Sequence, residues 1–211
     1  MNGEVAISVS YEGIYRGTGK RAVDIIGAGV GIFFAIPFFV IIPILIKLIS
    51  KGPVFYKQER TGKDGKSFIL YKFRSMRDGA EKETGPVWVT PDDKRVTSLG
   101  RFLRKTGLDE LPQFFNVLKG EMSIVGPRPE RPFFIEKYSC LQGRRLGVKP
   151  GLFCLAEAEN GTSDHNHSFA CNPEAKVKYD IRYIDNYSFW LDMKVIALVG
   201  LKLLFQRYNF S

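Results

Sequence analysis

Two adjacent carboxylates, Asp109 and Glu110, are the residues in this sequence best suited to carry chemistry. They follow Gly107 and precede an apolar segment, which predicts that they occupy the first turn of a helix. Pro112 is tolerated there because early helix N–H groups are unpaired. Acidic residues at such a position are also ordinary complements to the helix dipole. A carboxylate can also act chemically, as a nucleophile or as an oxygen ligand for Mg²⁺. The neighbouring charges decide between a structural and a chemical role.

Clustered cations would complete such chemistry, because a reacting phosphoryl group needs positive charge around its oxygens. Lys72 and Arg74 end a segment of strand-like composition, and alternate side chains of a strand share a face. Arg128 lies between Pro127 and Pro129, which restrict the backbone and lower the entropy lost when the guanidinium binds a phosphate. A solvated basic strand end and an ordinary Pro-rich turn are the structural alternatives. Together, the carboxylates and cations favour phosphoryl transfer.

The hydrophobic pattern predicts the elements that must position these residues. Two segments rich in aromatic and β-branched residues, 54–58 and 67–73, flank a turn containing Asp64-Gly65, which predicts a β-hairpin. Apolar residues recur at helical spacing in the segments 96–103 and 111–118, which predicts two amphipathic helices. The sequence therefore predicts an α/β domain with a β-hairpin and several amphipathic helices.

A charge-free run from Ile25 to Ile46 is long enough to enter a membrane. The pair Ile36 and Pro37 predicts a bend that divides the run into arms of about 18 and 14 Å, each roughly half of a ~30 Å hydrocarbon core. Both flanks are basic, so the positive-inside tendency indicates no direction of crossing. We expect a re-entrant helix that enters and leaves on one face; a kinked single span is the alternative.

These segments predict a domain plan and limit the partners. We expect an N-terminal tail (1–19), a re-entrant helix–break–helix (20–50), a cytoplasmic catalytic domain (51–188) and a C-terminal amphipathic helix (189–211). That last helix either lies along the membrane surface or belongs to the core. The net charge of +9 indicates an anionic partner, which could be nucleic acid, anionic lipid or a phosphorylated substrate. Three cysteines without a C-x-x-C motif fit a reducing cytoplasm and suggest no zinc site.

Several ordered motifs resemble those of the bacterial sugar transferases, the monotopic polyprenyl phosphate phosphoglycosyl transferases. The resemblance runs from about Lys20 to Lys194 and includes the membrane segment. Its motifs are SKGPVFYKQERTG (50–62), YKFRSM (71–76), LDELPQ (108–113), NVLKGEMS (116–123) and VGPRPE (125–130). The chain departs from the family pattern twice. Ile36-Pro37 replaces the usual Ser-Pro of the re-entrant helix, and residues 153–162 replace a stretch with Trp, Gln and Asn-Gly-Arg.

The resemblance implies an enzyme that transfers a phosphosugar from a nucleotide diphosphosugar, expected to be a UDP-sugar, to polyprenyl (undecaprenyl) phosphate. The products would be a polyprenyl diphosphosugar and UMP. By the same resemblance, Asp109 attacks the phosphoryl group that bears the sugar and forms a covalent aspartyl phosphosugar, and Glu110 assists it. Mg²⁺, held by Asp109, would neutralise the diphosphate.

The resemblance also implies the remaining site residues and partners. Lys72 and Arg128 match family positions in the active site and at the phosphate, and Arg74 and Arg104 are assigned to the same surface. The expected location is the bacterial inner membrane, with the catalytic domain on the cytoplasmic face. The expected partners are a UDP-sugar, polyprenyl phosphate and membrane lipid, without nucleic acid; a homo-oligomer is left open. Two alternatives remain: a direct glycosyltransferase that releases UDP, and a membrane-tethered basic module without catalysis.

Overall fold

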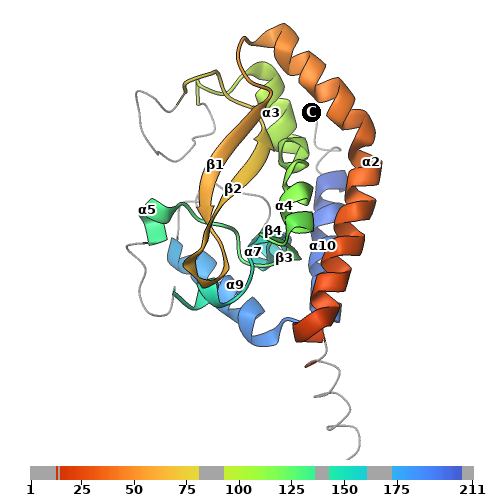
Figure 1. Cartoon of the computed structure of the whole chain (residues 1–211), viewed down its shortest axis with the longest axis vertical. Coiled ribbons are helices and arrows are strands. Elements are labelled where there is room, and N and C mark those ends of the chain that lie inside the picture. The colour runs from red at the N-terminus through yellow and green to blue at the C-terminus, as the bar shows by residue number, and fades with distance from the viewer. Residues whose placement is uncertain (1–12, 14, 81–92, 136–142, 161–172, 206–211) are drawn as a thin grey trace, which may run out of the picture.

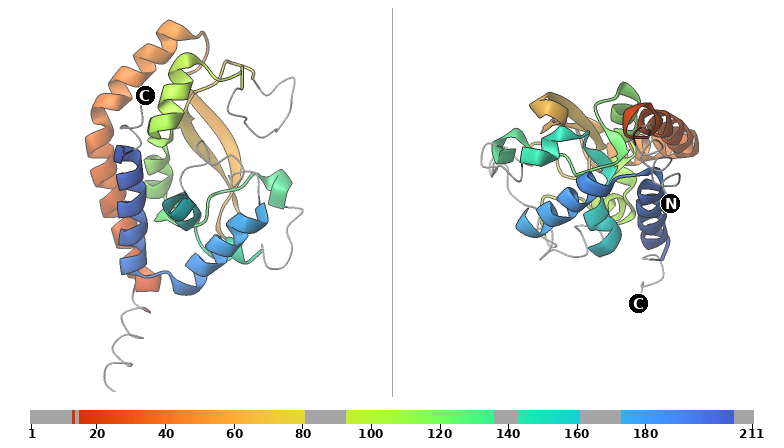
Figure 2. Two further views of the ribbon diagram at one scale, coloured as in Figure 1. Left: turned by 180° about the vertical axis from the view of Figure 1, so that it is seen from behind. Right: turned by 90° about the horizontal axis from the view of Figure 1, so that it is seen from below.

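A computed structural model of the chain describes residues 13, 15–80, 93–135, 143–160 and 173–205. Among them, one long helix curves along the side of a domain built from shorter helices and two small sheets (Figures 1 and 2). One sheet is the antiparallel pair β1–β2, and the other is the parallel pair β3–β4. The mixture of helices and strands agrees with the predicted fold class.

The elements follow one another in this order. They are η1 (Tyr15–Gly19), α2 (Lys20–Ile49), β1 (Phe55–Thr61), η2 (Lys63–Gly65), β2 (Ser67–Phe73), α3 (Ser98–Thr106), η3 (Leu108–Glu110), α4 (Gln113–Lys119), β3 (Ser123–Val125), α5 (Pro132–Ile135), η4 (Arg144–Gly147), β4 (Gly151–Phe153), α7 (Leu155–Asn160), α9 (Pro173–Asn186) and α10 (Phe189–Phe205).

The predicted hairpin is confirmed as β1 and β2, joined by the short turn η2. Asp64 in that turn has φ 58°, a left-handed conformation that Asp tolerates better than most residues, and Gly65 follows with φ 74°. Along β2, Phe68, Leu70 and Phe73 are buried. The hairpin therefore packs its apolar side on the domain, and Lys72 lies at its end.

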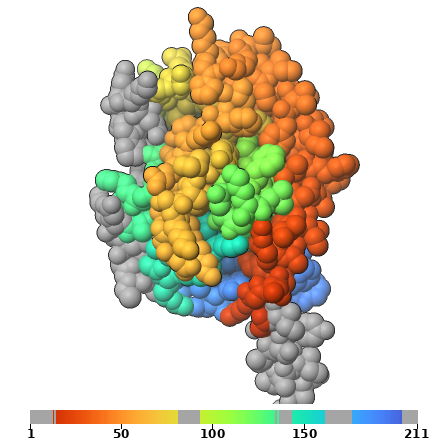
Figure 3. Space-filling model, viewed as in Figure 1, coloured from red at the N-terminus to blue at the C-terminus, as the bar shows by residue number. Residues whose placement is uncertain are grey.

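The two predicted amphipathic helices are α3 and α4. α3 begins after Thr97, whose side chain accepts a hydrogen bond from a backbone N–H of the first turn at 2.9 Å. It ends at Gly107, which has φ 69°, the left-handed conformation common after a helix. α4 lies between the hairpin and α2, as the space-filling view shows (Figure 3). Asn116 of α4 donates to the Ile69 carbonyl at 2.7 Å and accepts from the Tyr71 N–H at 3.2 Å, which joins α4 to β2.

The charge-free run forms one helix, α2, of 30 residues, about 45 Å long. It is helical across Pro37 and Pro43, so the helix is not interrupted at Ile36-Pro37, where a break was predicted. The helix curves instead (Figure 1), which is how a helix accommodates a proline without losing its other hydrogen bonds. By length and composition α2 can cross a membrane. Entry and exit on one face stay a prediction.

Polar contacts that the sequence analysis did not anticipate hold the first half of α2 on the domain. Arg21 donates to two carbonyls at the C-terminal end of α4, at 2.6 and 2.7 Å, and so satisfies groups that a helix end leaves unpaired. The buried Asp24 accepts from the Ser123 hydroxyl at 2.7 Å and from the Ile124 N–H at 2.9 Å. Part of the basic flank of α2 therefore docks the helix on the domain.

The C-terminal helix α10 is a core helix on its inner face. Its buried Asp192 accepts hydrogen bonds from Lys20 at 2.5 Å, from Tyr183 at 2.7 Å and from the Tyr15 hydroxyl. The outer face carries Trp190, which is 78 % exposed, and its contact with a membrane stays a prediction.

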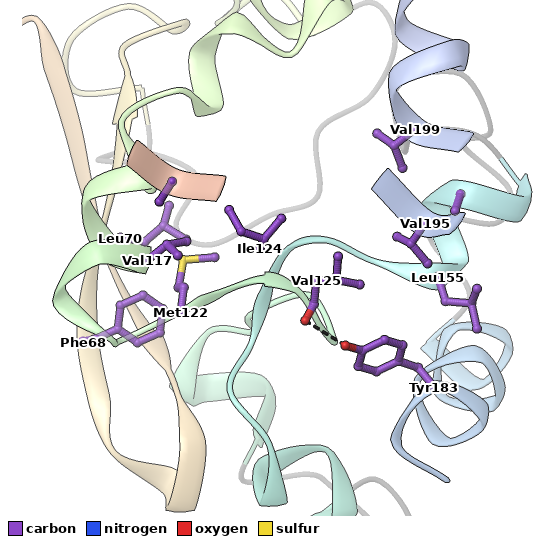
Figure 4. Close-up of a cluster of buried hydrophobic side chains, with 12 residues drawn as sticks. Phe68, Leu70, Val117, Met122, Ile124, Val125, Leu155, Tyr183, Val195 and Val199 are labelled. Carbon is purple, nitrogen blue, oxygen red and sulfur yellow. Dashed lines mark hydrogen bonds between the residues drawn. The ribbon is translucent and has the colours of Figure 1, made fainter. Parts of the chain in front are cut away.

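The main hydrophobic core joins the hairpin, α4, β3, α7, α9 and α10 (Figure 4). Its labelled members are Phe68, Leu70, Val117, Met122, Ile124, Val125, Leu155, Tyr183, Val195 and Val199. The Tyr183 hydroxyl donates to the Val125 carbonyl at 2.9 Å, which satisfies both buried groups. This core holds β2, α4 and α7 together, and a second cluster that includes Phe73 and Leu108 joins the end of β2 to η3.

Candidate active site

Asp109 and Glu110 lie in the 3-10 turn η3. The sequence had predicted that they occupy the first turn of the following helix, and that prediction is wrong. Pro112 is the N-cap residue of α4, with φ −62° and ψ −17°, and α4 begins at Gln113. The left-handed Gly107 redirects the chain after α3, so η3 is a separate turn between two helices. Asp109 is buried, at 5 % exposed.

Glu110 brings together two of the predicted cations. Its Oε1 atom accepts from Lys72 Nζ at 2.5 Å and from Arg128 at 2.5 Å. The other arm of the Arg128 guanidinium donates to Glu157 Oε1 at 2.7 Å. We call Lys72, Glu110, Arg128 and Glu157 the charge cluster. Residues from β2, η3, the Pro-rich turn and α7 therefore meet in this cluster, and its member Glu110 follows Asp109 directly in the chain.

The charge cluster sets the protonation of Glu110. Burial raises the pKa of this carboxyl, but the charges of Arg128 and Lys72 outweigh that effect and hold the pKa at about 2, below its ordinary value of 4.5. The Glu110 and Glu157 charges in turn raise the pKa of Arg128. Glu110 is therefore ionised at neutral pH and acts in this structure as an acceptor for two cations.

A second set of contacts holds the turn that carries Arg128. Arg60 donates to the Pro129 carbonyl at 2.9 Å, and Arg145 donates to the Arg128 carbonyl at 3.2 Å. Arg145 is buried and lies 2.8 Å from Asp180 of α9 in an ion pair. The two prolines are thus only part of what positions Arg128. Two arginines bind the backbone of the turn directly.

Arg74 and Arg104 do not join the charge cluster. The buried Arg74 donates to the Ser50 and Lys51 carbonyls, each at 2.8 Å, and so fastens the end of α2 to the end of β2. Arg104 donates from Nε to the Ser75 hydroxyl at 2.8 Å, which ties α3 to the same strand end. The structure gives both arginines positioning contacts, and their assignment to phosphate binding stays a prediction.

Glu157 is a cluster residue that the sequence analysis missed. It lies in the segment 153–162 that departs from the family pattern, so no motif marked it. Its partner Arg128 is 29 positions away in the chain. The segment's acidic residues were a signal that a carboxylate was available, but their spacing did not indicate which of them turns towards the arginine.

The acidic residues also determine how a magnesium ion would fit. Among the residues that the structure describes, no group of three or more His, Cys, Asp and Glu side chains converges. Mg²⁺ does not need such a group, because it is commonly bound by one or two carboxylates together with substrate phosphates and water. Glu110 binds Lys72 and Arg128 in this structure, and a magnesium ion at Asp109 stays a prediction.

Comparisons with known proteins identify the family of the chain. Residues 15–206 match the model of the family described as bacterial sugar transferase. A UDP-glucose:undecaprenyl-phosphate glucose-1-phosphate transferase of Klebsiella pneumoniae is 44 % identical, over 87 % of this chain and 39 % of that protein.

Two further relatives extend the comparison. A UDP-N-acetylgalactosamine-undecaprenyl-phosphate N-acetylgalactosaminephosphotransferase of Aeromonas hydrophila is 39 % identical, over 84 % of this chain and 41 % of that protein. An exopolysaccharide production protein PSS of Rhizobium leguminosarum bv. phaseoli is 36 % identical, over 84 % of this chain and 90 % of that protein. The chain thus spans about two fifths of the length of the first two relatives and most of the third. On the family match over residues 15–206, the protein belongs to the bacterial sugar transferases.

Proposed function

We propose that this protein transfers a sugar 1-phosphate from a UDP-sugar to undecaprenyl phosphate, giving undecaprenyl diphosphosugar and UMP. The names of the Klebsiella and Aeromonas relatives support this general reaction, since both combine a UDP-sugar with undecaprenyl phosphate. The observation that carries the proposal is the buried Asp109 followed in the same turn by Glu110, whose carboxylate holds Lys72 and Arg128 together.

The reaction proceeds in two displacements at phosphorus. A carboxylate oxygen of Asp109 attacks the phosphorus that bears the sugar, the bond from that phosphorus to the bridging oxygen breaks, and UMP leaves with that oxygen. A phosphate oxygen of the acceptor then attacks the same phosphorus. The bond to Asp109 breaks and its carboxylate is restored. No proton needs to be supplied by Glu110, which fits its low pKa.

The cations of the charge cluster lower the electrostatic repulsion between an anionic nucleophile and an anionic phosphoryl group. Lys72 and Arg128 bring two positive charges to the turn that contains Asp109, and fixed cations stabilise charge at phosphoryl oxygens without reorganisation. In the structure Glu110 and Glu157 occupy the donors of Arg128. A bound diphosphate would take the place of one of these carboxylates as the acceptor for the Arg128 guanidinium. Mg²⁺, when bound at Asp109, would supply further positive charge at the diphosphate.

The helix α2 supports a membrane location for this chemistry. It exposes large apolar side chains along its length, among them Phe33, Phe34 and Leu48, which are 67, 69 and 77 % exposed. Such a surface is stable only against lipid or another apolar partner. We place the protein at the bacterial inner membrane with the charge cluster on the cytoplasmic side, where UDP-sugars are made available.

The test is to incubate the purified protein with undecaprenyl phosphate and a panel of UDP-sugars, and to identify the released nucleotide. UMP is expected; release of UDP would instead establish direct glycosyl transfer. Asp109→Asn should lower turnover by several orders of magnitude. The matched control is Asp64→Asn in the exposed hairpin turn, which should retain activity.

The covalent step has its own readout. Without acceptor, mass spectrometry should find the phosphosugar mass on the peptide that contains Asp109. Normal turnover by Asp109→Asn would exclude the aspartyl intermediate. Salt-sensitive binding of anions without any turnover would instead support a basic binding module.

A further inference from the structure

A basic pocket lies where α2 ends and α3 begins, with a volume of about 840 Å³. Figure 1 shows the C-terminal end of α2 near α3 at the upper end of the molecule, and residues at the end of α2 and the start of α3 line the pocket. None of its lining residues belongs to the charge cluster, and Asp109 does not line it. The pocket is therefore a separate candidate binding site.

Four cations line this pocket: Lys51, Arg77, Lys94 and Arg101. All four side chains are exposed, and none has an ion-pair partner in the part of the chain that the structure describes. Asp93, which precedes Lys94, is paired with Arg95 at 2.6 Å. Four like charges around one hollow repel one another unless an anion occupies it. The charge of the pocket thus indicates an anionic ligand.

The first turn of α3 forms part of the same wall. Thr97 and Ser98 line the pocket, and α3 begins at Ser98. The first N–H groups of a helix have no acceptor within the helix and carry part of the positive end of the helix dipole. The Thr97 hydroxyl satisfies only the Gly100 N–H. Hydrogen-bond donors therefore accompany the four cations, a combination that suits phosphate oxygens.

The pocket also has an apolar part, which continues along α2. Ile49, the last residue of α2, lines the pocket and is 50 % exposed. On the preceding turn, Ile44, Leu45 and Leu48 are exposed as well. A free anion would use the cations and leave this apolar surface uncovered. A phosphate attached to an apolar chain would use both.

We propose that this pocket binds the phosphate group of a membrane lipid whose apolar chain lies along the end of α2. Both bilayer phospholipids with a phosphate headgroup and prenyl phosphates have this chemistry. The inference does not depend on the transfer reaction, because binding is measured without a sugar donor.

The experiment uses the full chain in a non-ionic detergent and titrates it with four probes by calorimetry. These are farnesyl phosphate, a short-chain phosphatidic acid, farnesol and inorganic phosphate. The pocket variant is the double substitution Arg77→Gln with Arg101→Gln. Its matched control is Lys63→Gln with Lys66→Gln in the exposed hairpin turn, which removes the same charge elsewhere.

The pocket variant should bind the lipid phosphates at least about tenfold more weakly than the wild type, since each cation near a lipid phosphate contributes about 1 kcal/mol. The control should stay within about twofold. Tighter binding of farnesyl phosphate would assign the site to a prenyl phosphate, and tighter binding of phosphatidic acid to a bilayer lipid. The proposal would be overturned if the pocket variant bound the lipid phosphates no more weakly than the control variant. It would also be overturned if the wild type bound farnesol or inorganic phosphate as tightly as the lipid phosphates.

Discussion

Replacing Glu110 by Gln is expected to destabilise the protein, because it removes the charge that balances Lys72 and Arg128 while keeping the side-chain shape. The fall of the Glu110 pKa from 4.5 to about 2 corresponds to about 3 kcal/mol of stabilisation, at about 1.4 kcal/mol per pH unit. Arg128 retains Glu157 in the variant, and Lys72 is partly exposed, so part of the loss is recovered. We expect the free energy of unfolding to fall by about 2–3 kcal/mol.

The pH dependence of this loss follows from the sign of the change. The pKa of Glu110 is lower in the folded than in the unfolded protein, so the unfolded chain takes up the proton first as the pH falls. The stabilisation is complete above about pH 4.5 and disappears as the pH falls towards about 2. The difference between wild type and Glu110→Gln should therefore be constant from about pH 8 to 5 and shrink below about pH 4.5.

The measurement is urea unfolding of the full chain in a non-ionic detergent, followed by circular dichroism over this pH range. Near neutral pH the thermal midpoint should also fall by roughly 5–10 °C. Glu59→Gln on β1 is the matched control. Glu59 is exposed and has no ion-pair partner among the described residues, so its loss should change the free energy by less than about 0.5 kcal/mol. A Glu110→Gln variant as stable as the control, or a difference undiminished near pH 3, would refute the reasoning.

Two further substitutions test the packing around the site, with the thermal midpoint as the measurement. Gly100→Ala should destabilise the protein by more than about 2 kcal/mol, since its Cβ would lie 1.8 Å from the Ser75 carbonyl oxygen. Gly29→Ala has no atom within 4 Å of the new Cβ and should be neutral or stabilising; equal effects would contradict the close approach. Asp192→Asn removes a buried charge that accepts three hydrogen bonds and should cost about 3 kcal/mol. Asp185→Asn, in an exposed ion pair, should cost less than about 1 kcal/mol, and a loss equal to that of Asp192→Asn would refute this contrast.

Local patterns were sufficient to predict several elements correctly. The hairpin, α3 and α4 were recognisable because alternation and helical spacing depend on neighbouring residues alone. The delay of α4 beyond Pro112 was not predicted, because two short turns can share one apolar pattern. The break at Pro37 was overestimated, since a proline can be absorbed by curvature when the rest of the helix is packed or surrounded by lipid.

The sequence by itself determined the family, through ordered motifs, and the candidates Asp109, Glu110, Lys72 and Arg128. It did not determine which cations reach the carboxylates. Arg74 and Lys72 are two positions apart in the chain, yet the first binds the end of α2 and the second binds Glu110.

Only the tertiary structure decided that Glu157 belongs to the charge cluster. Residues 153–162 were visible as a departure from the family pattern, but their contacts depend on how α7 packs against α9 and α10. Coulomb and hydrogen-bond energies depend on distances in space of a few ångströms, and these distances are set by the packed core. The sequence therefore specified the charged groups, and the core decided which of them meet.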